Sequence, residues 1–131
     1  MMNFKELALK EESYILEQRR WLHAHPELGT KEYKTTEHIV NELKSFGIEV
    51  QVFDDITGCV GIIRGKQPGR TVMLRADIDA LPIQEENNCG LCAQNPGVMH
   101  ARAPPGIPAI RQCCWLPVKC WRQIKSSCTE R

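Results

Sequence analysis

The stretch EYKTTEHIVNELKSFGIEVQVF, residues 32–53, contains a change of hydrophobic period that decides the fold class. In its first half, one helical face carries Tyr33, Thr36, Val40 and Leu43. In its second half, apolar and polar residues alternate, which is typical of a half-buried strand. Gly47 stands between the two patterns, where a glycine can end a helix in the left-handed conformation. The stretch therefore predicts a helix over residues 32–46 and a strand directly after it.

A helix is also expected upstream of this stretch. Asn3 followed by Glu6 has the spacing of a capping box, in which two side chains satisfy backbone N–H groups at a helix start. Apolar residues then recur at roughly helical spacing as far as the HAHPE motif: Phe4, Leu7, Ala8, Ile15 and Leu22. Pro26 ends this helix, because the residue before a proline avoids the helical region of backbone space.

Two further strands are expected downstream. The segments CVGIIRG (59–65) and TVMLRAD (71–77) are apolar and partly β-branched, and KQPGR between them supplies a proline and a glycine for a turn. We expect the two segments to form a hairpin, with residues 71–77 as an interior strand, because that segment is apolar nearly throughout. The order helix, helix, strand, hairpin predicts an α/β domain.

Candidate functional residues follow the predicted interior strand. Asp77 and Asp79 lie at its carboxyl end, where ligands bind in open α/β sheets, and could ligate a metal or orient a ligating group. From the spacing alone, a solvated acidic loop or a cap for the next helix is the favoured explanation. His23 and His25 form a second candidate pair, but at a helix end their side chains would point in different directions. A structural role near the helix C-terminus is therefore favoured for these histidines.

Overall composition indicates an ordinary soluble protein of one domain at most. Hydrophobic residues make up 42% of the 131 residues and charged residues 25%. A net charge of +1 gives no indication of a nucleic-acid or membrane partner. The sequence contains no apolar run long enough to span a bilayer and no apolar signal core near its start, so a cytoplasmic location is expected.

The composition changes abruptly near residue 87. Residues 1–86 carry a net charge of −4, residues 87–131 carry +5, and six of the seven cysteines lie in the second part. A zinc site could use the C-x-x-C pair Cys89 and Cys92 with later cysteines, but the adjacent Cys113 and Cys114 do not match the regular spacing of structural zinc sites. A non-enzymatic Cys-rich zinc-binding or interaction module remains an alternative.

Four segments occur in the order and spacing of a known family: RRWLHAHPELGTKEYKTTEHIVNELKSFGIEV, TGCVGIIRG, PGRTVMLRADIDALPIQEE and NPGVMHA. Over about residues 4–101, the chain resembles the start of the metal-dependent amidohydrolases that include hippurate hydrolase, the auxin-conjugate hydrolases and N-acetyldiaminopimelate deacetylase. The resemblance implies an incomplete N-terminal portion of an α/β metallopeptidase-like catalytic domain. It also implies hydrolysis of N-acyl amino acids or related conjugates with two zinc or manganese ions. Members of the family often form dimers through a smaller inserted domain.

The resemblance assigns roles to individual residues. Asp77 and Asp79 match the acidic loop near the metals, and Asp79 is the better candidate for orienting a metal ligand. His100 matches the first histidine of the family motif MHACGHD, whose cysteine and second histidine bind metal. The catalytic candidates that this chain retains are therefore Asp79 and Asp77.

The match to the family motif ends at Ala101. In the family, the metal-binding cysteine follows directly at the next position and the metal-binding histidine two positions later. This chain has Arg102 and Pro104 there, and arginine cannot bind a cation because it stays protonated. The family ligands that would follow Ala101 are thus missing, and we expect no metal-ligand set and no activity from this chain alone.

A change of reading frame explains residues 102–131. Cysteine codons begin with TG, as does the tryptophan codon, so Cys113–Cys114, Cys114–Trp115 and Cys120–Trp121 each encode leucine one frame over. The hidden peptide resembles the HTAMLLGAAKLL helix that follows the metal motif in the family. We therefore expect residues 1–101 to be a truncated catalytic domain and residues 102–131 an out-of-frame, disordered tail. A pseudogene product without function is a further alternative.

Overall fold

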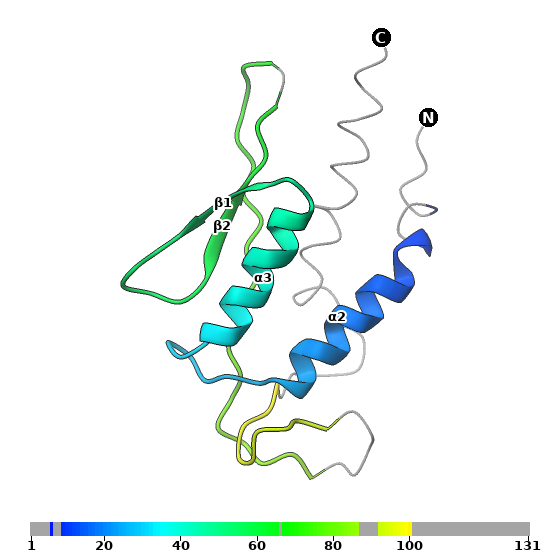
Figure 1. Cartoon of the computed structure of the whole chain (residues 1–131), viewed down its shortest axis with the longest axis vertical. Helices are drawn as coiled ribbons and strands as arrows, with labels where there is room; N and C mark the ends of the chain where they lie inside the picture. The colour runs from blue at the N-terminus through cyan, green and yellow to red at the C-terminus, as the bar shows by residue number, and fades with distance from the viewer. Residues whose placement is uncertain (1–5, 7–8, 66, 87–91, 101–131) are drawn as a thin grey trace.

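The computed structural model describes residues 6, 9–65, 67–86 and 92–100. Its elements are α2 (Glu12–Ala24), α3 (Tyr33–Ser45), β1 (Glu49–Val52) and β2 (Cys59–Ile62). The strands form an antiparallel hairpin against one side of α3, and α2 lies on the other side (Figure 1). Two helices and a strand hairpin confirm the predicted α/β architecture. The predicted helix start at Asn3 and the predicted disordered tail fall outside the described residues.

Helix α3 begins and ends within one residue of its predicted bounds. Its buried side chains include Ile39 and Leu43, which form the centre of the hydrophobic core. The chain leaves the helix through Gly47, whose φ of 68° lies in the left-handed region that glycine adopts without strain. The carboxylate of Glu32, just before the helix, accepts a hydrogen bond from the Thr57 hydroxyl and so ties α3 to the β1–β2 connection.

The hairpin packs closely on α3 because one of its positions carries no side chain. Strand β1 pairs with β2 in a register that places Val50 opposite Gly61. A Cβ at Gly61 would lie only 3.3 Å from Cδ1 of Leu43. Glycine at this position therefore allows the helix to approach the sheet, and Ile48, Val50, Cys59 and Ile78 pack around the two core residues of α3.

Helix α2 is attached to α3 through aromatic and polar side chains. The Tyr14 hydroxyl donates a hydrogen bond of 2.6 Å to the Glu42 carboxylate, and the Tyr14 ring meets Phe46 edge to face. One turn from the end of α2, Trp21 stacks on His38 with ring centroids 3.7 Å apart. Aromatic and polar side chains therefore connect α2 to α3, whereas apolar side chains pack between α3 and the hairpin.

The predicted hairpin between residues 59–65 and 71–77 is wrong. Strand β2 pairs with β1 instead, and residues 71–77 form no strand. Val72, Met73 and Leu74 are exposed by 83%, 84% and 60%. An interior strand gains its ladder hydrogen bonds and its apolar burial from neighbouring elements, and in the described part of the chain the sheet consists of β1 and β2 alone. In the described part of the chain, no helix is long and apolar enough to cross a membrane.

Replacing Gly61 by valine is expected to destabilise the fold by about 1–3 kcal/mol, because the added side chain would overlap Leu43 and push α3 away from the hairpin. The free energy of unfolding, measured by urea titration followed by circular dichroism, tests this expectation. Gly69→Val is the matched control, since a Cβ at Gly69 meets nothing within 4 Å. The control should change the free energy by less than about 0.5 kcal/mol. Equal effects of the two substitutions would contradict the packing argument.

Candidate functional site

The turn that follows α2 makes hydrogen bonds to two segments that are distant from it in the sequence. The Ala80 N–H donates a hydrogen bond of 2.7 Å to the carbonyl of Glu27, and Leu28 forms a parallel bridge with Ala80. On the same turn, the Asn95 side-chain amide donates to the carbonyl of Pro26 at 2.7 Å. Ala80, at 3% exposure, is the most buried of the apolar core residues in the described part of the chain. The turn therefore fixes the position of Asp79, one residue earlier.

The side chain of Glu27 accepts hydrogen bonds from α3, while its backbone carbonyl accepts one from Ala80. One carboxylate oxygen accepts the N–H of Thr35 at 2.8 Å, and the other accepts the N–H of Lys34 at 3.2 Å. The first N–H groups of a helix have no partner within the helix, and they favour a negative charge. Glu27 thus connects the beginning of α3 to the segment that carries Asp79.

A short antiparallel bridge brings His100 to the same place. Leu81 and Met99 exchange two backbone hydrogen bonds, of 2.9 and 3.1 Å. Asp79 precedes this bridge on one segment and His100 follows it on the other. The backbone and the charge of Asp79 both act to raise the pKa of His100.

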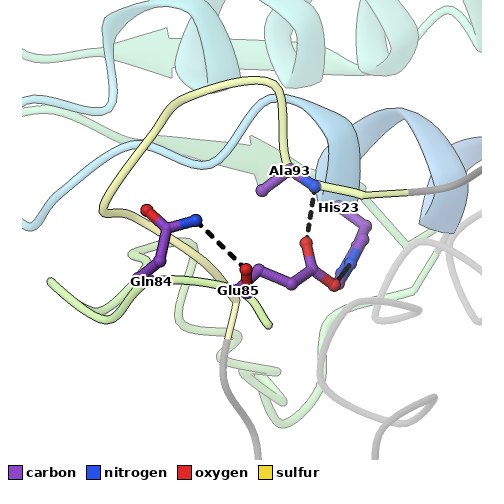
Figure 2. Close-up of polar contacts among 4 residues, drawn as sticks. All are labelled: His23, Gln84, Glu85 and Ala93. Atoms are coloured by element: carbon purple, nitrogen blue, oxygen red, sulfur yellow. Dashed lines mark hydrogen bonds and ion pairs between the residues drawn. The ribbon is translucent and has the colours of Figure 1, made fainter. Parts of the chain in front are cut away.

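A buried carboxylate fastens this loop to α2. The Glu85 side chain is 5% exposed, and one of its oxygens lies 3.1 Å from Nε2 of His23. Its other oxygen accepts the Ala93 N–H at 2.6 Å, while the backbone carbonyl of Glu85 accepts a hydrogen bond from Gln84 (Figure 2). Figure 2 shows the carboxylate of Glu85 lying between the His23 ring and the Ala93 backbone. A buried carboxylate that contacts both His23 and the Ala93 N–H holds this loop against α2.

His100 is largely buried, and its Nε2 atom has no hydrogen-bond partner among the described residues. Burial lowers the pKa of His100, and the neighbouring His23 lowers it further. The backbone and the charge of Asp79 act in the opposite direction. The net lowering of the pKa favours the neutral imidazole, which is the form that can accept a proton or bind a metal.

The structure brings some of the predicted candidates together and separates others. Asp79 is exposed and its charge raises the pKa of His100, whereas the carboxylate of Asp77, also exposed, pairs with Arg75 at 2.9 Å. His23 reaches the site through Glu85. His25 instead places its Nδ1 atom 2.7 Å from the Trp21 carbonyl and stacks on the Trp21 ring. The two histidines therefore diverge as predicted.

Glu27 and Glu85 were not recognised in the sequence as site residues. Each makes hydrogen bonds to residues at another point of the chain, and such contacts produce no periodic pattern. The only available signal was the position of Glu27 directly after the helix-ending Pro26. An acidic residue shortly before a helix start is favoured by the helix dipole.

These residues do not by themselves fit a two-metal centre. Within the ranges that the structure describes, no group of three or more histidine, cysteine, aspartate or glutamate side chains could hold a metal ion. Nε2 of His100 is a single unused donor. Of the cysteines considered for a zinc module, all except Cys92 lie outside the described residues.

The end of the family motif lies just beyond the described part of the chain. The structure describes His100, whereas Ala101 and the positions after it, where the family ligands would follow, are outside the described residues. The expectation that these ligands are missing therefore rests on the sequence, in which Arg102 and Pro104 occupy their positions. It stays a prediction, as do the boundary placed at Ala101 and the roles given to Asp77 and Asp79.

The chain is similar in sequence to metal-dependent amidohydrolases. No family model matches it. It is 43% identical over 106 residues to an N-acyl-L-amino acid amidohydrolase of Geobacillus stearothermophilus, a match that covers 81% of this chain and 29% of the relative. It is 37% identical over 111 residues to an N-acetyldiaminopimelate deacetylase of Exiguobacterium sibiricum, covering 80% of this chain and 30% of that protein. The chain thus spans just under a third of the length of these relatives.

Solved structures agree with the sequence comparison. A dinuclear metal binding peptidase of the M20 family from Bacillus subtilis matches 92% of this chain with a TM-score of 0.76 and 31% identity. A crystal structure from methicillin-resistant Staphylococcus aureus, described as an aminohydrolase, matches 93% with a TM-score of 0.81 and 33% identity. The chain covers 32% of each of these structures. The resemblance predicted from the sequence motifs is confirmed, and the coverage fits the N-terminal part of such a hydrolase.

The stability of the chain is expected to fall as the pH is lowered from 7.5 to 5.5. Burial lowers the pKa of both His38 and His100, so the folded state binds fewer protons than the unfolded state in this range. Their contribution is complete above the unfolded histidine pKa of about 6.5 and is lost as the pH falls through it toward the lower folded values. Urea titrations at several pH values measure this loss. The double variant His38→Gln, His100→Gln should show a flatter dependence, and an unchanged dependence would refute the assignment.

Proposed function

We propose that this chain forms the N-terminal part of a metal-dependent amidohydrolase that cleaves the amide bond of N-acyl amino acids or related conjugates. The observation that carries the proposal is the 43% identity to an N-acyl-L-amino acid amidohydrolase, in a chain whose turn after α2 holds the segment that bears Asp79. We further propose that the complete enzyme uses zinc or manganese, is located in the cytoplasm and forms a dimer. The free thiol of Cys59 suits a reducing compartment.

Within such an enzyme, the described residues would support and orient the reacting groups. Asp79 presents a carboxylate next to a neutral imidazole, which suits a residue that orients a ligand or a substrate group. Asp77 would act from further away, because its ion pair with Arg75 occupies an exposed surface. Arg102 and Pro104 stand where the family motif has its metal-binding cysteine and histidine, and on that ground this chain alone is not expected to hydrolyse a substrate.

The same proposal includes an explanation for the sequence of residues 102–131. We infer that the residues after Ala101 are translated out of frame, which accounts for Arg102 at the position of a metal-binding cysteine and for the cysteine-rich composition that follows. Sequencing the gene from the codon of Gly97 past the stop codon tests this inference. A downstream frame that encodes the missing CGHD motif supports it, and a continuous open frame without that motif refutes it. No observation in the described residues favours a separate zinc-binding module.

A chimera provides the test of the proposed activity. Residues 1–101 of this chain are joined to the part of the Geobacillus relative that begins with its own metal motif. The chimera is expected to hydrolyse hippurate or another N-acyl amino acid in a metal-dependent manner. Asp79→Asn should lower kcat/KM by roughly 10- to 100-fold, the usual effect of losing a residue that orients a ligand.

The matched control for this test is Asp55→Asn, which removes an exposed carboxylate from the β1–β2 connection and should leave kcat/KM unchanged. Asp77→Asn should have a smaller effect than Asp79→Asn, because the Asp77 carboxylate faces solvent and Arg75. A chimera that folds and binds metal but hydrolyses no N-acyl amino acid would contradict the proposed function. Full activity of the Asp79→Asn chimera would contradict the role given to that residue.

A further inference from the structure

The carboxylate of Glu85 is buried between two segments that meet near the site. Its side chain is 5% exposed, and its two oxygens have different partners (Figure 2). One oxygen lies 3.1 Å from Nε2 of His23 on α2, and the other accepts the Ala93 N–H at 2.6 Å. Burial of a carboxylate is unfavourable unless hydrogen bonds replace the lost water, and here each oxygen has such a partner.

The contact with Glu85 determines which nitrogen of His23 carries a proton. An ionised carboxylate accepts hydrogen bonds and donates none, so the hydrogen in this contact belongs to Nε2 of His23. The neutral imidazole of His23 therefore has its lone pair on Nδ1. The His23 side chain is 28% exposed, so small molecules can reach part of it, whereas Glu85 is almost fully enclosed.

His23 acts electrostatically on a residue of the site. It lowers the pKa of His100, whereas the charge of Asp79 raises it. The imidazole of His100 is thus subject to side chains from two other segments, the end of α2 and the segment that contains Asp79. A change in the charge or the proton position of His23 would therefore alter the electrostatic field at His100.

The loop that contains Ala93 is also attached to α2 without the help of Glu85. The Gln94 N–H donates a hydrogen bond of 2.9 Å to the carbonyl of Ala24, and the Asn95 side chain donates to the carbonyl of Pro26 at 2.7 Å. Anchoring the loop therefore does not account for the charge of Glu85. Its contact with the imidazole of His23 is the interaction in which that charge has a distinct effect.

We propose that Glu85 is a positioning residue for the hydrolysis, and that it acts through His23 by holding the proton on Nε2 and the ring in one orientation. This inference rests on the proposed function for the reaction that it affects. Glu85 does not touch the substrate; it orients an imidazole, as carboxylates behind histidines do in many enzyme sites. Its loss should therefore lower kcat and leave KM nearly unchanged.

The variant Glu85→Gln separates the two contacts of Glu85. The amide oxygen can still accept the Ala93 N–H, which leaves the NH2 group facing Nε2 of His23. Nε2 then has to accept a hydrogen bond, so the proton of the neutral ring moves to Nδ1. Nitrogen-15 NMR of the full 131-residue chain, at about pH 8.5 where histidines are ordinarily neutral, detects this difference.

The spectra are expected to show the Nε2–H form of His23 in the original chain and the Nδ1–H form in Glu85→Gln. Hydrogen exchange at the Ala93 amide should be the same in both chains, because its acceptor is retained. The matched control is Glu86→Gln, which removes the same charge from the next residue, an exposed one, and should leave His23 in the Nε2–H form. The same form of His23 in the original chain and in Glu85→Gln would overturn the proposal.

The effect on the reaction is measured in the chimera with the Geobacillus relative. Glu85→Gln is expected to lower kcat by roughly 10- to 100-fold and to change KM by less than about twofold. His23→Gln should lower kcat to a similar extent. The double variant should be no slower than the slower single variant, because Glu85 acts only through His23. An unchanged kcat in Glu85→Gln, an equal loss in Glu86→Gln, or additive losses in the double variant would each refute the positioning role.

The two measurements separate this inference from the proposed function, because the NMR spectra require no activity. An inactive parent chimera refutes the proposed function, and the proton position in His23 then still decides whether Glu85 fixes this imidazole. An active parent chimera whose kcat is insensitive to Glu85→Gln refutes the positioning role and leaves the function intact.

Discussion

Glu27 is the residue on which the arrangement of the site depends. Its carboxylate satisfies N–H groups at the start of α3, and its carbonyl accepts the Ala80 N–H. Because the position of Glu27 is fixed by Pro26 at the end of α2, the helices and the Asp79 segment are located relative to one another by a single turn. The Leu81–Met99 bridge then adds His100 to this arrangement. The geometry of the site is therefore set by these hydrogen bonds together with the packing of Ile78 and Ala80 in the core.

Local signals in the sequence predicted the elements that are stabilised locally. The bounds of α3 and the turn at Gly47 followed from apolar periodicity and from the ability of glycine to adopt a positive φ. The alternation of apolar and polar residues predicted strand β1, but it did not predict that β1 pairs with β2. Residues 71–77 show why: an apolar run indicates the environment in which a segment is stable, and that environment depends on neighbours. Without covering elements, the same residues remain exposed.

The site could be predicted only in part. Asp79 was identified because it follows an apolar segment, and His100 because it belongs to a motif of the family. From their spacing, Asp77 and Asp79 were treated as a pair. In the structure Asp77 pairs with Arg75, whereas Asp79 is the one of the two that influences the pKa of His100. The roles of Glu27 and Glu85 depend on long-range contacts that no pattern in a single sequence encodes. Similarity to known hydrolases supplies the chemistry that these contacts support.

Hydrogen exchange at the Ala80 amide, followed by NMR on the intact chain, tests the central role of this turn most directly. Ala80 lies in a segment without regular structure, so its amide would exchange rapidly if its bond to the Glu27 carbonyl did not persist. The account predicts protection similar to that of the Leu43 amide in the core of α3. Exchange as fast as that of the exposed Met73 amide would show that the turn does not hold the Asp79 segment, and would contradict the account.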